Sequence, residues 1–211
     1  LLMSGDVMLD VDFHRFINFH KEHQALASLT VHPNNHPFDS SLIVTEILPA
    51  SNGGMPIHTN RVVKWMNKED ERLYYRNIVN AGIEMISPRL LEEARAKLPS
   101  LDKVDLDRDV LKPAIESGKI YAYETSEYIK DMGTPERLIE VENDLLSGKI
   151  AAHNLSVKQK AVFLDRDGTI NETNGFLTDI NDFELIEGAA EAIKQINKSG
   201  YLAVVVTNQP V

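Results

Sequence analysis

The stretch 161–171, AVFLDRDGTIN, constrains the fold of this chain more than any other. Its apolar beginning has the composition of a buried strand, and Asp165 and Asp167 follow at once, with Gly168 behind them. A strand that ends in this way places both carboxylates at its C-terminal edge, where open α/β sheets hold their ligands. Side chains alternate along an extended chain, so the two carboxylates are expected to point to the same side. The stretch predicts a parallel strand with a ligand site at its end.

Two acids one residue apart suit the chemistry of phosphate esters. One carboxylate can attack phosphorus and form an acyl phosphate, while the other protonates the leaving oxygen and later deprotonates water. Two carboxylates about 4 Å apart repel by roughly 4 kcal/mol at a surface-like dielectric, so a cation that prefers hard oxygen ligands is expected with them. Asp165 and Asp167 are therefore predicted to bind Mg²⁺. The alternative is an Asp-Gly turn that simply follows a buried strand.

The residues after this stretch predict one βαβ unit. Residues 187–197 place four apolar side chains on one helical face. Residues 201–206, YLAVVV, have the continuous apolar character of a buried parallel strand. This strand ends in the triplet TNQ, which pairs Thr207 and Asn208 with Asp165 across the βαβ unit.

The segment DRDGTIN resembles the first motif of the haloacid-dehalogenase (HAD) phosphatase superfamily, in the form found in histidinol-phosphate and heptose-bisphosphate phosphatases. The resemblance implies that Asp165 is the nucleophile and Asp167 the general acid and base. TNQ resembles the second motif, which makes Thr207 and Asn208 substrate-binding residues and gives the Thr207 hydroxyl to the transferring phosphoryl group. Pro210-Val211 replace the usual Ser-Gly of the family.

The resemblance also implies what surrounds this motif. The spacing before the next helix is too short for a cap domain, and capless members of the family commonly act on small phosphorylated sugars. The third-motif lysine and fourth-motif aspartate do not follow, so we expect only the N-terminal part of a phosphatase domain.

Residues 1–149 predict a second α/β arrangement. We expect strands at 1–9 (interrupted at Gly5-Asp6), 26–31, 42–46, 61–65 and 119–123, and helices at 12–23, 88–98 and 134–146. Asp12 is a plausible N-cap of the first helix, and Gly53-Gly54 are expected to form a turn between two strands. Residues 77–87 are apolar around a central Asn-Ala-Gly.

Three segments of this part, LLMSGDVMLDVDF, NAGIEMISPRLL and EYIKDMGTPERL, resemble the C-terminal two-thirds of a sugar-1-phosphate nucleotidyltransferase. The resemblance implies that Asp6 and Asp131 ligate Mg²⁺ and that Asn80 and Gly82 lie around the sugar. It also relates Lys68 to a lysine that contacts the sugar phosphate, although the family's Glu-Lys-Pro is Asn-Lys-Glu here. Gly-Asp and Asp-x-Gly are also common turn pairs, and a solvated surface lysine is an equal interpretation of Lys68.

Two acids from distant parts of the sequence that hold one Mg²⁺ would serve nucleotidyl transfer. The attack of a sugar phosphate on an NTP brings two polyanions together, and positioning with charge neutralisation supplies most of the catalysis. The family's N-terminal glycine-rich loop for the NTP does not occur, so we expect a fragment of a longer protein, with little activity of either kind by itself.

Composition limits the partners of the chain. With 22 Lys and Arg against 32 Asp and Glu, the formal net charge is −10, which argues against nucleic acid and anionic membranes. No apolar run approaches 18 residues, and residues 1–6 lack the basic and apolar segments expected of a signal peptide. The lack of cysteine is typical of a cytoplasmic protein, which we expect here.

These observations predict an α/β chain with two incomplete Rossmann-like domains: a nucleotidyltransferase-like mixed sheet at 1–149, a polar linker at 150–160 and a HAD-like parallel sheet at 161–211. The predicted function is hydrolysis of a sugar phosphate such as heptose 1,7-bisphosphate, fused to nucleotidyl transfer from an NTP such as GTP to a sugar 1-phosphate. One alternative is a phosphatase for histidinol phosphate or another small substrate, joined to a non-catalytic nucleotidyltransferase-like module. Another is a sensor of sugar phosphates in both halves.

Overall fold

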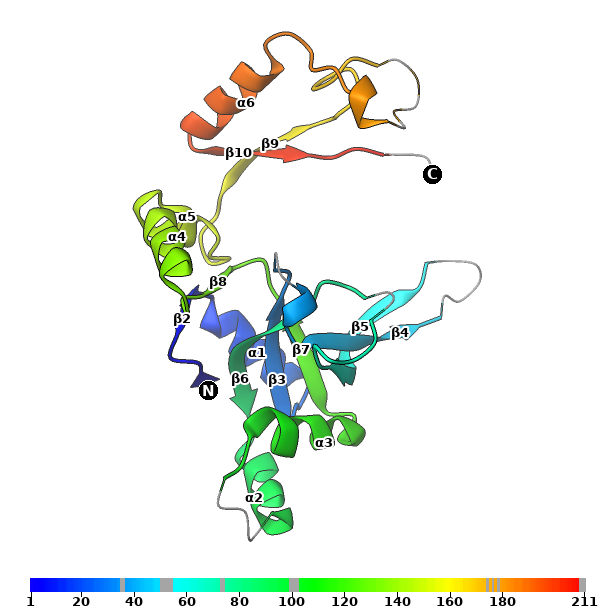
Figure 1. Cartoon of the computed structure of the whole chain (residues 1–211), viewed down its shortest axis with the longest axis vertical. Coiled ribbons are helices and arrows are strands. Elements are labelled where there is room, and N and C mark those ends of the chain that lie inside the picture. The colour runs from blue at the N-terminus through cyan, green and yellow to red at the C-terminus, as the bar shows by residue number, and fades with distance from the viewer. Residues whose placement is uncertain are drawn as a thin grey trace. The chain divides into compact units, whose positions relative to one another are not determined.

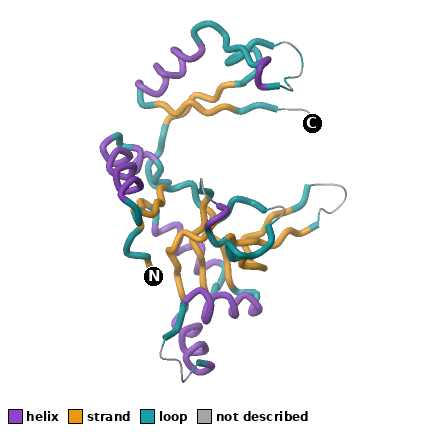
Figure 2. Tube along the Cα trace, viewed as in Figure 1, coloured by secondary structure: helices purple, strands orange, loops and turns teal. Residues whose placement is uncertain are grey.

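The computed structural model describes residues 1–34, 37–49, 55–72, 75–98, 103–173, 175, 177 and 179–208 (Figure 1). The chain divides into two compact units, Leu1–Ser156 and Val157–Val211. Figure 2 shows that helices and strands occur together in each unit. The predicted α/β class is confirmed, with a mixed sheet in the first unit and a parallel pair of strands in the second.

The elements of the first unit alternate along the sequence. Its strands are β1 (Leu2–Met3), β2 (Val7–Asp10), β3 (Ala27–His32), β4 (Leu42–Leu48), β5 (Ile57–Met66), β6 (Val79–Ile86), β7 (Ile120–Glu124) and β8 (Tyr128–Asp131). Its α-helices are α1 (Phe13–Glu22), α2 (Pro88–Lys97), α3 (Lys112–Ala114), α4 (Pro135–Leu146) and α5 (Lys149–Ala152). Short turns of other helix types are η1 (Pro37–Asp39), the π-helix η2 (Leu106–Leu111) and η3 (Ile115–Ser117).

A six-stranded mixed sheet, in the order β1-β6-β3-β7-β5-β4, forms the centre of this unit. β3 and β7 run parallel, and the other neighbouring pairs are antiparallel. β4 and β5 lead away from the centre of the sheet (Figure 1). β3 is covered on both faces, since Leu29 and Thr30, which point to opposite sides, are each 0% exposed.

α1 covers one face of this sheet. The Asp12 carboxylate accepts hydrogen bonds from the backbone nitrogens of His14 (3.0 Å) and Arg15 (3.3 Å), which confirms the predicted N-cap. Phe16 is fully buried, and its ring lies 5.1 Å from the ring of Tyr123 on β7. The opposite face is covered by α2 and η2, whose Leu90, Val110 and Leu111 pack with the inward side chains of β3 and β7.

β2 and β8 form a separate antiparallel pair, and α4 and α5 lie beside it. Ile150 of α5 is buried and packs with Tyr128 and Val141. The first residues of the stretch predicted as a polar linker, 150–160, therefore belong to the first unit. The segment reads as a linker because most of its residues are polar or small, yet Ile150 is buried and anchors α5.

A buried carboxylate fastens the end of the first unit. Glu127 is 3% exposed, and its Oε1 accepts hydrogen bonds from the backbone nitrogens of Asp12 (2.7 Å) and Leu155 (3.0 Å). Its Oε2 accepts a hydrogen bond from the hydroxyl of Thr125 (2.9 Å). The start of α1 and the last residues of the unit thus share one acceptor.

The second unit contains β9 (Lys160–Leu164), η4 (Ile180–Asp182), α6 (Ala189–Lys198) and β10 (Tyr201–Val205). β9 and β10 are parallel, with Leu164 paired to Val205, so the predicted βαβ unit is confirmed. Phe163 is 69% exposed, and the buried residues among those described in this unit are Ile170 and Asn171.

Some of the predicted features involve residues that the structure does not describe. The Gly53-Gly54 turn and the residues 209–211 lie outside the described part of the chain. Among the helices that the structure describes, none combines the length and apolar character needed to cross a membrane.

Candidate functional site

A cavity of about 530 Å³ lies in the first unit, at the carboxyl ends of its two parallel strands. His32 ends β3, Thr125 follows β7, and both line the cavity together with Asn80 near the start of β6. The carboxyl ends of parallel strands are where α/β sheets hold ligands, so the position of the cavity follows from the topology.

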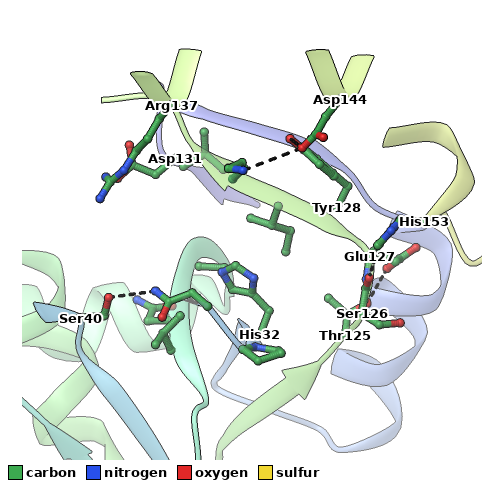
Figure 3. A pocket seen from close by; sticks show the side chains of 18 of the residues that line it. His32, Ser40, Thr125, Ser126, Glu127, Tyr128, Asp131, Arg137, Asp144 and His153 are labelled. Carbon is green, nitrogen blue, oxygen red and sulfur yellow. Dashed lines mark hydrogen bonds and ion pairs between the residues drawn. The ribbon is translucent and has the colours of Figure 1, made fainter. Parts of the chain in front are cut away.

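Polar side chains form two walls of this cavity. Figure 3 shows Asp131, Arg137, Tyr128 and Asp144 on the side of β8 and α4, with His32 on the opposite side. The walls carry both signs of charge. A ligand with several hydroxyl groups and an anionic group would find donors and acceptors here.

Asp144 organises the wall formed by α4. Its Oδ2 accepts a hydrogen bond from the Tyr128 hydroxyl (2.9 Å), and Lys149 Nζ donates to its Oδ1 (3.0 Å). Lys130 lies 3.9 Å away and also forms an ion pair with Glu140. Burial opposes ionisation of Asp144, but the hydrogen bonds from Lys149 and Tyr128 outweigh it and hold the pKa below its ordinary value. Burial, with the neighbouring carboxylate, raises the pKa of Tyr128.

The structure brings two of the sequence-predicted residues of this unit to the cavity, Asn80 and Asp131. Asp6, Gly82 and Lys68, all within the described part of the chain, are not among the residues that line it.

Asp6 and Asp131 nevertheless lie on neighbouring backbone segments. Val7 pairs with Asp131 across β2 and β8, and the backbone nitrogen of Met132 donates to the carbonyl of Asp6 (2.8 Å). Two carboxylates on adjacent strands offer the oxygen donors that Mg²⁺ prefers. Asp131 already receives Arg137 Nη1 at 2.6 Å, so an internal cation partly neutralises it. Among the described residues, no group of three or more candidate metal ligands comes together.

Gly82 is required by the local backbone, whereas Lys68 lies on the surface. Gly82 has φ +69°, which favours glycine, and a Cβ there would lie 2.5 Å from the hydroxyl of Ser4, the residue after β1. The side chain of Lys68 is 64% exposed, and its Nζ lies 3.9 Å from Glu69. A pair of exposed side chains this far apart adds little stability.

A second group of predicted residues gathers in the second unit, after β9 and β10. Leu164 pairs with Val205, and the backbone nitrogen of Val206 donates to the carbonyl of Leu164 (2.9 Å). Asp165 and Thr207 therefore begin the loops at one shared edge of the parallel pair. Asp165 Oδ1 accepts a hydrogen bond from the backbone nitrogen of the next residue (2.7 Å).

Asp167 is held by its neighbours in the loop. Arg166 donates to both of its oxygens, from Nε (2.9 Å) and Nη2 (3.0 Å), and Asn171 Nδ2 donates to Oδ1 (3.1 Å). Asn171 is 1% exposed, and its carbonyl accepts the backbone N–H of Gly168 (2.8 Å). Gly168 has φ +73°, as the tight turn requires. Two carboxylates at the end of a parallel strand fit the donor set of Mg²⁺.

Sequence reasoning missed several residues that shape these sites: Lys130, Arg137, Glu140, Asp144, Lys149, Arg166 and Asn171. For some of these residues the sequence spacing does contain information. Lys130 follows Tyr128 by two positions in a strand, and Glu140 precedes Asp144 by four in a helix, so each pair shares a face. Which face meets the cavity depends on packing.

The comparisons with known proteins concern part of the chain. No family model matches it. A D-glycero-β-D-manno-heptose-1,7-bisphosphate 7-phosphatase of Haemophilus ducreyi is 57% identical over 51 residues, 24% of this chain and 28% of that protein. Proteins of the same name from Photorhabdus laumondii and Escherichia coli K12 are 55% and 51% identical over 49 residues, 23% of this chain and 26% of each relative.

The chain thus spans little more than a quarter of the length of these curated relatives. Among solved structures, a Bacillus anthracis protein described as a glucose-1-phosphate thymidylyltransferase is 12% identical, with a TM-score of 0.47. The similar region covers 67% of this chain and 52% of that protein. A similarity this low carries no conclusion about fold or function.

Proposed function

We propose that this chain takes part in sugar-phosphate metabolism, and that its second unit carries the nucleophile of a phosphomonoester hydrolase acting on heptose 1,7-bisphosphate. The observation that supports this most strongly is the DRDGTIN loop at the end of β9, together with the high identity to heptose-bisphosphate phosphatases. We attribute that 51-residue match to the second unit because the loop lies there.

Each residue of the loop has a role in this proposal. Asp165 attacks the phosphorus, and Asp167 protonates the leaving oxygen and then deprotonates the water that releases phosphate. Thr207 and Asn208, at the same edge, bind the phosphoryl oxygens. Asp165 and Asp167 would hold Mg²⁺, which when bound offsets the repulsion between two carboxylates and a phosphate.

For the first unit we propose nucleotidyl transfer from an NTP to a sugar 1-phosphate. Its cavity lies at the carboxyl ends of β3 and β7 and offers donors and acceptors for a sugar. In this proposal Asn80 and Gly82 lie around the sugar, Lys68 contacts the sugar phosphate, and Asp6 and Asp131 would hold Mg²⁺. Of these residues, Asn80 and Asp131 line the cavity. Removal of one phosphate from a bisphosphate yields the sugar 1-phosphate that such a transfer consumes, so the two activities would act in sequence in one fused protein.

The phosphatase assignment is tested in the natural-length protein that carries this sequence. With Mg²⁺ and heptose 1,7-bisphosphate, Asp165→Asn should lower phosphate release by more than about 10³-fold because the nucleophile is lost. Asp182→Asn, an exposed aspartate of the same unit, is the control and should keep the rate. Unchanged turnover in Asp165→Asn would refute the nucleophile assignment.

A second candidate function is a phosphatase, for histidinol phosphate or another small substrate, with a non-catalytic first unit. Two observations favour it: Lys68 is exposed and outside the cavity, and Asp131 is paired with Arg137. Incubation of the natural-length protein with each NTP and a set of sugar 1-phosphates distinguishes the candidates. Formation of a nucleotide sugar supports transfer, and its complete absence supports the non-catalytic module.

A further inference from the structure

Glu84 of β6 is a buried carboxylate that the proposed function does not use. It is 2% exposed and lies between Leu2 of β1 and Leu29 of β3, its partners in the sheet. Its Oε1 accepts a hydrogen bond from Asn80 Nδ2 at 3.3 Å, while Oε2 is buried with no hydrogen-bond partner among the described residues. A buried carboxylate that is only half satisfied is costly, and the residue that donates to it, Asn80, lines the cavity.

The contacts of Asn80 define how its amide is turned. The backbone N–H of Gly82 donates to Asn80 Oδ1 at 3.4 Å, and a backbone N–H can only donate. The oxygen of the amide is therefore on the side of Gly82, and the nitrogen faces Glu84. An amide nitrogen carries two hydrogens, and Glu84 accepts one of them. Asn80 itself lines the cavity.

We propose that Glu84 is a positioning residue for the cavity: it fixes the amide of Asn80 so that the second amide hydrogen is presented to an oxygen of a phosphorylated sugar. This inference rests on the proposed sugar-phosphate site of the first unit. Glu84 does not line the cavity and acts through Asn80.

The charge of Glu84 controls how firmly it holds the amide. Burial raises its pKa to about 7, with the Asn80 hydrogen bond opposing and the charge of Asp107 adding to the rise. Asp107, on η2, has its own pKa raised by burial and by Asp105, while Lys112 lowers it. The partners of Glu84 on β1 and β3 are leucines.

Ionised and protonated Glu84 should therefore bind the amide differently. A charged acceptor forms a hydrogen bond about twice as strong as a neutral one. When Glu84 gains a proton, Asn80 spends a smaller fraction of time in the competent orientation, and the apparent affinity falls by that fraction.

The test compares wild type with Glu84→Gln, which keeps an acceptor oxygen but does not titrate. Calorimetry with mannose 1-phosphate as the probe, from pH 6 to pH 8, measures the affinity of each. The phosphate of the probe titrates equally for both proteins, so only the difference between them counts. We expect wild type to lose about fivefold more affinity than Glu84→Gln on going from pH 8 to pH 6. Asn80→Ala should lose no more affinity than Glu84→Gln over the same pH range.

Parallel pH profiles in wild type and Glu84→Gln would overturn the inference, whereas binding by neither protein would remove the proposed sugar site. The coupling of the two side chains is then decided without ligand, from the NMR signals of the Asn80 side-chain amide, identified by their loss in Asn80→Ala. Movement with a midpoint near pH 7 in wild type, absent in Glu84→Gln, supports a carboxylate that holds this amide. Signals that stay fixed with pH in both proteins would refute it.

Discussion

The candidate carboxylates lie at an antiparallel strand pair, β2 and β8, in the first unit and at the end of parallel β9 in the second, and the central strands of the two units differ in how deeply they are buried. In the first unit β3 is covered on both faces, and Leu29 is 0% exposed. In the second unit Phe163 of β9 is 69% exposed and Val205 of β10 is 50% exposed. Parallel strands are usually buried on both faces. The most specific sequence motif nevertheless lies in the unit with less burial. The loop that carries this motif is held by hydrogen bonds between residues close in sequence.

The largest effect expected from this difference is on core truncation. Phe16→Ala should lower the free energy of unfolding of the first unit by about 3–5 kcal/mol, because a fully buried ring leaves a cavity. Phe163→Ala should cost the second unit less than about 1 kcal/mol, because its ring is already in solvent. Trp65, 7% exposed in the first core, reports urea unfolding of that unit, and amide exchange in α6 reports the second. A loss above about 2 kcal/mol in Phe163→Ala would contradict this contrast.

The next effect concerns a buried charge in the better packed unit. The pKa of Glu84 rises from 4.5 to about 7 on folding, so the folded state keeps a proton that the unfolded state releases. Its contribution to stability therefore falls as the pH rises from 4.5 through 7, by roughly 3 kcal/mol in all. Glu84→Gln should match wild type near pH 4.5 and exceed it by about 2–3 kcal/mol at pH 8. Urea unfolding monitored through Trp65 at both pH values measures the difference, and equal gains at both would exclude burial of the charge as the cause.

A smaller effect is expected in the loop of the second unit. Asn171→Ala removes the amide that donates to Asp167 Oδ1 (3.1 Å) and to the carbonyl of Glu172 (2.8 Å), and should cost about 1–2 kcal/mol. The exchange rate of the Gly168 amide, whose acceptor is the Asn171 carbonyl, should rise accordingly. Asn181→Ala, in an exposed turn, is the control and should leave that rate unchanged. Unaltered exchange in Asn171→Ala would mean that the backbone alone holds the loop.

The smallest effect compares helix starts. Asp12→Ala should destabilise the first unit by about 1 kcal/mol, since two backbone donors lose their acceptor. Ser87→Ala, at the start of α2, should change stability by a few tenths at most, because that side chain makes no capping bond. In the second unit the N-cap of α6 is Gly188, which makes no side-chain capping bond. Similar losses in both variants, in thermal unfolding, would show that capping is not what separates them.

The features that the sequence predicted well have local causes. Asp12 stands before an apolar helical face, and the βαβ unit around Asp165 combines a motif with two apolar runs. The features that escaped prediction depend on distant partners. The π-helix η2 and the burial of Ile150 depend on packing, and the residue pattern of their own segments does not predict them.

The candidate sites divide in the same way. The motif predicted the loop after β9. The hydrogen bonds from Arg166 to Asp167 depend on the conformation of the loop, which the spacing of residues does not determine. In the first unit, the register of β2 and β8 sets Asp6 beside Asp131, while Arg137 takes up the Asp131 carboxylate. The wall built by Asp144 needed the three-dimensional structure, because its partners come from two other elements, β8 and α5.

The carboxylate of Glu127 joins two distant segments of the first unit. It ties the first turn of α1 to the peptide of Leu155, 28 residues after itself and immediately before the second unit begins. Glu127 also lines the cavity of the first unit, so one side chain contributes both to the cavity wall and to the end of this unit. Loss of this carboxylate would leave two backbone donors without their acceptor, one at the start of α1 and one near the end of the unit.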